Sequence, residues 1–267
     1  MLRTLLIRPG GIGDCILAFP AMECLRSSYT EVWVPSAVVP LIRFADRVRA
    51  ISSTGLDLLG LPGIVPDAGV VEYLRSFDAI VSWYGSSRED FRRAMAALNL
   101  RFDFLPALPD EARGMHCCDV FLEQAGCSLG KCPRIPCDVV SSRDLAVIHP
   151  FSGSGKKNWP LERFRELAGR LPLAVSWCAG PEESLSNAYR SENLYELGCW
   201  LASARIYIGN DSGITHLAAA VGVPVVAIFG PTDPRVWGPR GQRVRVVRGK
   251  LEDITVEEVI NAVDALL

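Results

Sequence analysis

Short apolar runs alternate along this chain with longer segments in which apolar residues recur every three or four positions. The runs have the length of buried strands, and the longer segments have the spacing of amphipathic helices. Strands are expected at 3–8, 31–34, 48–51, 78–83 and 100–104, and then at 144–149, 173–177, 205–209 and 223–229. Helices are expected from the first loop to about residue 26, and at 88–98, 111–125, 161–171, 194–204, 212–221 and 255–267. This alternation predicts parallel sheets with helices on both faces.

The alternation is interrupted by a stretch rich in proline, glycine and cysteine, at 106–136. We interpret it as the approach to a domain boundary. The prediction is an N-terminal Rossmann-like domain with its linker at 1–140 and a C-terminal Rossmann-like domain at 141–267. Two such halves would enclose a cleft between the carboxyl ends of their strands, where open α/β sheets bind ligands.

The composition excludes several classes of protein. The chain has 267 residues, 49% hydrophobic content, a formal net charge of −2 and a pI near 6.0. It can form a sizeable core, and it has no overall basic field for binding nucleic acid. No apolar run reaches the length of a membrane span, and the apolar part of the N-terminus is too short for a signal sequence. We therefore expect a cytoplasmic protein.

Nine cysteines are scattered among apolar neighbours without a paired framework, which is typical of a reducing compartment. Several lie close together in the sequence and raise the question of a metal cluster: His116, Cys117, Cys118, Cys127, Cys132 and Cys137. Zinc sites normally use short gaps between ligands, and no C-x-x-C motif occurs. Buried thiols are the favoured interpretation.

The stretch 208–234, IGNDSGITHLAAAVGVPVVAIFGPTDP, is the most informative one. We expect Asp211 to cap a helix, so that the backbone N–H groups of Ser212, Gly213 and Ile214 point outward and attract an anion. Gly213 has no Cβ and would admit a phosphate close to the backbone. The alternative is an ordinary helix cap. His216 lies one turn further on, where it would reach a phosphate oxygen or a sugar hydroxyl, or serve the structure only.

The first loop, RPGGIGD at 8–14, lies between a predicted strand and a helix. Gly11 and Gly13 begin like a dinucleotide-binding fingerprint, but Ile16 replaces its third glycine, so NAD or FAD binding is a weak prediction. We expect the two glycines to make room for a ligand instead. Asp14 is either a general base or the cap of the following helix, and the residues alone do not decide.

The second loop, at 149–160, resembles a phosphate-binding P-loop only superficially. Lys157 stands where a hydroxyl residue would hold magnesium, and a proline replaces the first glycine, so the ATPase interpretation fails. Ser152, Ser154 and Lys157 still make a suitable phosphate cradle.

The chain contains no D-x-D motif, the carboxylate pair with which many glycosyltransferases bind a diphosphate through a cation. We therefore expect no metal and no cofactor, with lysine, backbone N–H groups and a helix dipole neutralising any diphosphate. Glu182 and Glu183 follow another predicted strand. One of them would accept hydrogen bonds from a ribose diol, or both lie in a helix first turn.

Four motifs together, RPGGIGD, K-x-W at 157–159, AGPEE at 179–183 and the 208–234 stretch, resemble the ADP-heptose:lipopolysaccharide heptosyltransferases, glycosyltransferase family 9. The resemblance implies a GT-B fold, in which two Rossmann-like domains with parallel sheets face a central cleft. It also implies metal-independent, inverting transfer of a heptose from an ADP-linked donor to a lipopolysaccharide-type acceptor. The donor would bind the C-terminal domain and the acceptor the N-terminal one, and a lipid-linked acceptor would bring the protein to the inner face of the cytoplasmic membrane.

The same resemblance implies a role for each matching residue. Asp14 would be the catalytic base, Lys157 the lysine on the donor phosphates, and Glu182 or Glu183 the acid on the nucleoside. The donor turn would comprise Asp211, Ser212, Gly213 and His216. Two other functions stay open on the same scaffold: a nucleotide-sugar epimerase or hydrolase, and a non-catalytic nucleotide-sugar-binding protein, the latter because the first domain is small.

Overall fold

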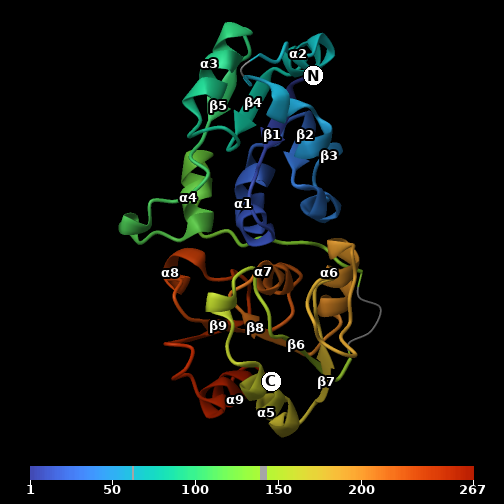
Figure 1. Cartoon of the computed structure of the whole chain (residues 1–267), viewed down its shortest axis with the longest axis vertical. Coiled ribbons are helices and arrows are strands. Elements are labelled where there is room, and N and C mark those ends of the chain that lie inside the picture. The colour runs from blue at the N-terminus through green and yellow to red at the C-terminus, as the bar shows by residue number, and fades with distance from the viewer. Residues whose placement is uncertain (62, 139–142) are drawn as a thin grey trace.

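The computed structural model describes residues 1–61, 63–138 and 143–267, and it contains two five-stranded parallel sheets (Figure 1). The strand order is β3-β2-β1-β4-β5 in the first sheet and β10-β9-β8-β6-β7 in the second. The order in which the chain adds strands reverses between β1 and β4 and again between β6 and β8. Ligands of open α/β sheets bind at such switch points. The predicted domain boundary between residues 140 and 141 lies outside the described residues.

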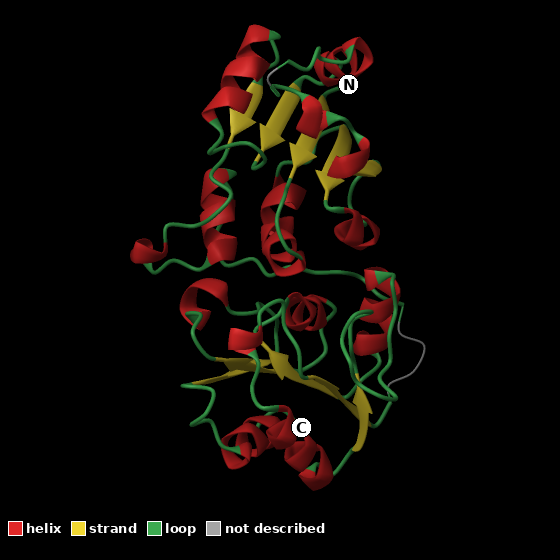
Figure 2. Ribbon diagram, viewed as in Figure 1, coloured by secondary structure: helices red, strands yellow, loops and turns green. Residues whose placement is uncertain are grey.

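Helices cover both faces of the first sheet (Figure 2). Its strands are β1 Arg3–Ile7, β2 Tyr29–Val34, β3 Arg47–Ala50, β4 Ala79–Ser82 and β5 Phe102–Phe104. The helices of this half are α1 Ile12–Cys24, α2 Ala68–Arg75, α3 Glu89–Ala97 and α4 Cys117–Gln124, with 3-10 turns η1 Ser36–Leu41, η2 Ile51–Ser53, η3 Leu56–Leu58 and η4 Glu111–Arg113.

The second sheet has α6, α7 and α8 on the face toward the first half, and α5 and α9 on the opposite face (Figure 2). Its strands are β6 Leu145–His149, β7 Ala174–Trp177, β8 Ile206–Asn210, β9 Val225–Phe229 and β10 Val244–Arg248. The helical elements are η5 Gly155–Lys157, α5 Leu161–Arg170, α6 Leu194–Ala202, α7 Gly213–Ala220, α8 Pro234–Trp237 and α9 Val256–Asp264.

The expected strands are all present, and all but one of the expected helices end within three residues of the prediction. The exception is 111–125, where the left-handed backbone of Gly114 (φ 60°) separates η4 from α4, so one predicted helix is two elements. Several elements were not predicted, among them α2, the short helix α8 and β10, in which arginines interrupt the apolar run.

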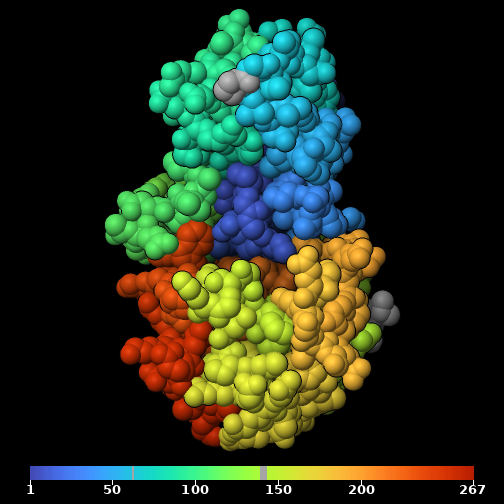
Figure 3. Space-filling model, in the orientation of Figure 1, coloured from blue at the N-terminus to red at the C-terminus, as the bar shows by residue number. Residues whose placement is uncertain are grey.

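One hydrophobic core extends through both halves of the molecule. Buried residues of α1 and α4 belong to the same cluster as buried residues of α7 and of β9. Helix α1 packs against both α4 and α7. In Figure 3 the dark blue surface that includes α1 lies directly above the surface of the second half. Two further clusters fill the outer faces of the two sheets.

Two glycines allow the first turns of α1 and α7 to meet. A Cβ on Gly213 would lie 2.7 Å from the Cβ of Ile12, and one on Gly13 would lie 2.7 Å from His216 Cδ2. Both glycines were predicted to make room for a ligand. The structure shows that protein atoms of the opposite half occupy it.

Replacing Gly213 by alanine should therefore separate the two halves locally. We expect Gly213→Ala to lower the free energy of unfolding by about 1–3 kcal/mol, the usual cost of overpacking a buried contact. Gly153→Ala is a matched control, because a Cβ there would meet no atom within 4 Å. Urea unfolding of both variants measures the difference, and equal stabilities would show that the contact yields without cost.

The cysteines depart from expectation at one pair. Cys24 and Cys127 form a disulfide with a Cα–Cα distance of 6.6 Å across 103 residues of sequence. Cys24 ends α1 and Cys127 follows α4, and the packing of these two helices brings them together. The expectation of no paired cysteines is therefore wrong here. Burial raises the pKa of both Cys117 and Cys118 to about 12, so these thiols stay protonated near neutral pH.

The described residues contain neither a metal-binding cluster nor a membrane-spanning helix. No group of three or more His, Cys, Asp or Glu side chains there is arranged to hold a metal ion. No helix among them is both long and apolar enough to cross a membrane.

Candidate functional site

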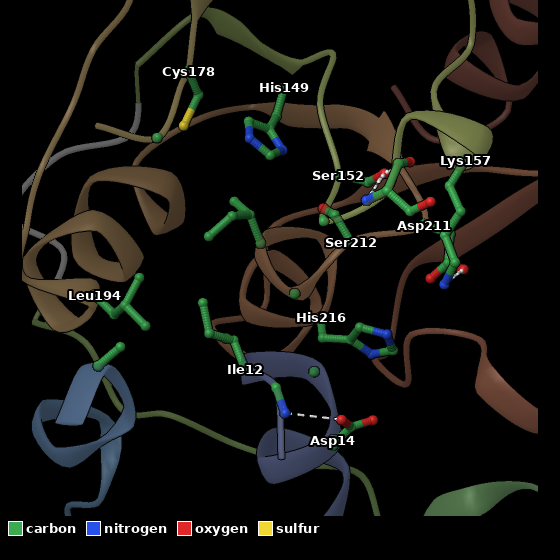
Figure 4. A pocket seen from close by; sticks show the side chains of 18 of the residues that line it. Ile12, Asp14, His149, Ser152, Lys157, Cys178, Leu194, Asp211, Ser212 and His216 are labelled. Carbon is green, nitrogen blue, oxygen red and sulfur yellow. Dashed lines mark hydrogen bonds and ion pairs between the residues drawn. The ribbon is translucent and has the colours of Figure 1, made fainter. Parts of the chain in front are cut away.

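A cleft of about 860 Å³ lies between the two halves and takes its walls from both. This volume is in the range of small-molecule sites. The loop after β1 forms one wall, and the loops after β6, β7, β8 and β9 form the other (Figure 4). Most of the predicted site residues line it: Gly11, Gly13, Asp14, Ser152, Ser154, Lys157, Glu183, Asp211, Ser212, Gly213 and His216.

The cap of α7 differs from the prediction. Ser212 is the N-cap residue, and its hydroxyl accepts a hydrogen bond from the Thr215 N–H at 3.3 Å. Asp211 does not cap the helix, because β8 continues to Asn210 and α7 starts only at Gly213. The N–H groups of Gly213 and Ile214 have no hydrogen-bond partner among the described residues. They open onto the cleft and suit an anion.

Asp211 instead forms an ion pair with Lys157. Its Oδ2 lies 2.7 Å from Lys157 Nζ, and the carboxylate side chain is only 7% exposed whereas the lysine is 35% exposed. The pair therefore places a cation, whose remaining donors are free to reach a ligand, beside the start of α7 (Figure 4). Ser152 holds the same loop in shape, since its hydroxyl contacts Ser154 O and Asn158 Oδ1, each at 2.7 Å.

Asn210, which was not among the predicted site residues, fixes this loop to β8. Its side chain is fully buried, accepts a hydrogen bond from the Trp159 N–H at 3.0 Å and donates one to Pro150 O at 2.8 Å. An amide with both a donor and an acceptor can satisfy two backbone groups at once. The loop that carries Lys157 is therefore held at both ends.

Asp14 lies inside the first turn of α1 and lines the cleft. Its Oδ2 accepts a hydrogen bond from the Gly11 N–H at 2.9 Å, and it lies in the first turn of α1. Its other carboxylate oxygen makes no hydrogen bond within the described residues, and Figure 4 shows the side chain beside His216. The expectation that Asp14 is the cap residue is therefore wrong, because α1 already begins at Ile12 with Gly11 as its N-cap. The role of general base stays a prediction.

Arg8 was not among the predicted site residues either, and its side chain supports the first turn of α1. The side chain is almost fully buried and donates to Asp14 O and to Ala107 O, at 3.2 and 3.1 Å. The guanidinium also lies over the ring of Phe121, 4.5 Å from its centroid. Burial lowers the pKa of Arg8 from its ordinary value. The loop 8–14 is therefore anchored by a buried cation.

His216 is buried at the meeting point of the halves, and its Nδ1 has no hydrogen-bond partner in the part of the chain that the structure describes. Burial lowers its pKa to about 4, although the carboxylates of Asp211 and Asp14 act in the opposite direction. The imidazole is therefore neutral at pH 7. A neutral ring with an unpaired nitrogen can take part in one further hydrogen bond.

His216 should make stability depend on pH. Its folded-state pKa of about 4 lies below the ordinary value of 6.5, so the unfolded chain binds a proton first as pH falls. The stabilisation that the neutral His216 ring gives the folded state is fully present above pH 6.5. It is lost toward pH 4, which lowers the free energy of unfolding by at most about 3 kcal/mol. We expect His216→Gln to flatten the stability curve between pH 6.5 and 4 in urea titrations. Parallel curves for the two proteins would contradict this assignment.

The structure distinguishes the two adjacent glutamates. Glu183 lines the cleft at the end of β7, where its Oε2 accepts hydrogen bonds from the Gly180 N–H at 2.6 Å and from His149 Nε2 at 3.2 Å. Burial alone would raise the pKa of Glu183, but the hydrogen bonds from His149 and Gly180 lower it overall. Glu182 is exposed and does not line the cleft. Of the two, Glu183 is thus the one placed to contact a ligand in the cleft.

The structural neighbours support the two-sheet architecture. A structure of Escherichia coli heptosyltransferase WaaC with ADP has a TM-score of 0.68 and 18% identity, and the match covers 100% of both chains. A glycosyltransferase family 9 structure from Veillonella parvula has a TM-score of 0.75 and 19% identity, covering 99% of this chain and 97% of the other. The chain therefore has the GT-B fold that its sequence predicted.

Part of the chain is also similar in sequence to curated heptosyltransferases. Lipopolysaccharide heptosyltransferase 1 of Escherichia coli is 32% identical over 126 residues, which are 42% of this chain and 40% of the relative. Lipopolysaccharide heptosyltransferase 2 of Salmonella typhimurium is 40% identical over 129 residues, 40% of this chain and 37% of the relative. The chain thus matches about two fifths of the length of these curated relatives.

The family itself is identified by a broader match. The sequence profile of glycosyltransferase family 9 (heptosyltransferase) matches residues 118–259, which are more than half of the chain. The matched region contains the loops that carry Lys157, Glu183 and Asp211. The chain belongs to glycosyltransferase family 9.

Proposed function

We propose that this protein is an inverting glycosyltransferase that moves a heptose from an ADP-linked donor to a lipopolysaccharide-type acceptor. The observation that carries the proposal is one cleft with a carboxylate on one wall and an anion site on the other. Asp14 comes from the first half, and Lys157 with the start of α7 comes from the second. Family membership and the names of the sequence relatives support heptose as the sugar.

Each wall would supply one part of the reaction. Asp14 would remove the proton from the acceptor hydroxyl as that oxygen attacks the anomeric carbon from one face of the sugar. The bond to the nucleoside diphosphate breaks on the other face, and the Lys157 ammonium and the N–H groups of Gly213 and Ile214 would stabilise the departing negative charge. These groups provide the neutralisation without requiring a metal ion.

The two halves would divide the substrates between them. The nucleoside would lie near Glu183 at the end of β7, with its diphosphate at the switch point between β6 and β8. This assigns the donor to the C-terminal half, 141–267, and the acceptor to the N-terminal half, 1–140. A lipid-linked acceptor would place the enzyme at the inner face of the cytoplasmic membrane.

Calorimetry with ADP, UDP and GDP tests the donor assignment. ADP should bind more tightly than the other two, and ADP-heptose with a lipopolysaccharide core acceptor should yield ADP and an extended glycan. ADP-heptose alone should remain unchanged, whereas an epimerase or hydrolase would convert it. Binding without turnover in the presence of acceptors would favour the non-catalytic function, and no binding of any nucleotide would refute the proposal.

A further inference from the structure

The cleft continues beyond the predicted phosphate site. The order of strands in the second sheet places the loop after β7 at one end of the cleft, those after β6 and β8 in the middle, and the loop after β9 at the other end. Glu183 marks the first end, and Thr232 and Trp237 mark the last. With the nucleoside at Glu183 and the diphosphate in the middle, a sugar would lie toward Trp237.

Trp237 is the one Phe, Tyr or Trp residue among the described residues that line the cleft. It ends α8, and its indole Nε1 donates a hydrogen bond to Glu111 Oε1 at 2.8 Å. Glu111 also lines the cleft and belongs to the linker. The two halves of the molecule therefore meet here in a pair consisting of a flat aromatic surface and a carboxylate.

Two neighbouring contacts reinforce the position of this pair. His116 Nε2 lies 2.9 Å from Gly238 O, and Arg240 forms a bidentate ion pair with Asp119. Both contacts join the same two segments, 111–119 and 237–240, as the Glu111–Trp237 hydrogen bond does. The residues that directly follow the indole in the chain are thus fixed to the segment that carries Glu111, which favours a preorganised binding surface.

We propose that Trp237 and Glu111 form a sugar-binding platform, with the indole stacked on the C–H face of a pyranose ring and Glu111 accepting hydrogen bonds from its hydroxyls. A pyranose has apolar C–H groups on its faces and hydroxyls at its edge, so an aromatic plane beside a carboxylate matches both. Glu111 retains one oxygen that does not contact the indole. The inference rests on the proposed function, and the ring belongs either to the donor or to the acceptor.

Calorimetry on Trp237→Leu separates these two sources. If the ring belongs to the donor, the affinity for ADP-heptose falls about three- to tenfold, as expected for loss of a stacking contact, while the affinity for ADP is unchanged. If it belongs to the acceptor, the affinities for ADP-heptose and for ADP are both unchanged. In transfer assays, the KM for a lipopolysaccharide core oligosaccharide then rises by a similar factor. Wild-type values for all three would overturn the platform.

Tryptophan fluorescence provides a second measurement that does not require the leucine variant to fold. Saturation with the sugar-bearing substrate, but not with ADP, should change the emission of the wild-type protein, and Trp237→Phe should abolish this change. Trp200→Phe is the matched control, because Trp200 stacks on Tyr189 at 4.0 Å and does not line the cleft. A change that persists in Trp237→Phe would overturn the proposal.

These outcomes are distinct from failure of the proposed function. If wild-type protein binds no ADP and transfers no heptose, the transferase proposal fails, and titration of wild type and Trp237→Phe with the core oligosaccharide still tests the platform. If wild type transfers heptose and Trp237→Leu does so with unchanged constants, only the platform fails. Glu111→Ala should weaken the same substrate as Trp237→Leu, and Glu111→Gln should partly restore it, since the amide oxygen can still accept from the indole.

Discussion

Asp14→Asn should abolish most of the heptosyl transfer while leaving ADP binding intact. General base catalysis typically contributes about 10²- to 10⁴-fold, so kcat should fall within that range. The amide oxygen of asparagine can still accept the Gly11 N–H hydrogen bond that Asp14 accepts at 2.9 Å, so the first turn of α1 should be preserved. The loss would then arise from the missing base and not from a disturbed loop.

Asp67→Asn is the matched control for this substitution. Asp67 caps α2 by accepting a hydrogen bond from the Val70 N–H at 2.9 Å, and it does not line the cleft. Rates and unfolding free energies should be close to wild type for Asp67→Asn. Transfer by Asp14→Asn at more than a tenth of the wild-type rate would remove Asp14 from the role of base.

Lys157→Met should weaken the binding of ADP and of ADP-heptose. A hydrogen bond to a charged group is worth about 1.5–3 kcal/mol, which corresponds to a loss of affinity of about ten- to hundredfold. The substitution also leaves the carboxylate of Asp211, which is only 7% exposed, without its cation. Stability should therefore fall together with affinity.

A second substitution separates these two effects. Lys157→Met combined with Asp211→Asn removes the unpaired charge, so stability should recover while diphosphate affinity stays low. Lys156→Met is the control, because the neighbouring lysine lies on the same 3-10 turn and does not line the cleft. Isothermal titration with ADP measures the affinities. Wild-type affinity in Lys157→Met, or an equal loss in Lys156→Met, would show that this lysine does not bind phosphate.

Much of the fold could be predicted from sequence because period-2 and period-3.6 patterns decide element type locally. β10 was not predicted, because Arg245 and Arg248 lie within it and an edge strand with exposed positions has no continuous apolar run. The split of 111–125 depends on the conformation of one glycine, Gly114. The N-cap of α7 was predicted one residue too early, because Asp211 and Ser212 are both favoured N-cap residues. Only the length of β8 decides between them.

Residues whose role depends on the other half of the molecule could not be found in this way. Gly213 looks like a phosphate-binding glycine in sequence, but its missing Cβ makes room for Ile12, which lies two hundred residues earlier. The Cys24–Cys127 disulfide depends on the packing of α1 against α4. Trp237 and Glu111 meet only when the linker folds back on α8.

The seam at which α1 meets α7 limits how this chain can be recombined with its relatives. A chimera that joins its second half to another first half would have to match the small residues Gly13 and Gly213 to the larger Ile12 and His216 that occupy their space. A mismatch at any of the four would misalign Asp14 with Lys157. The relative position of Asp14 and Lys157 and the packing of α1 on α7 therefore depend on the same four residues.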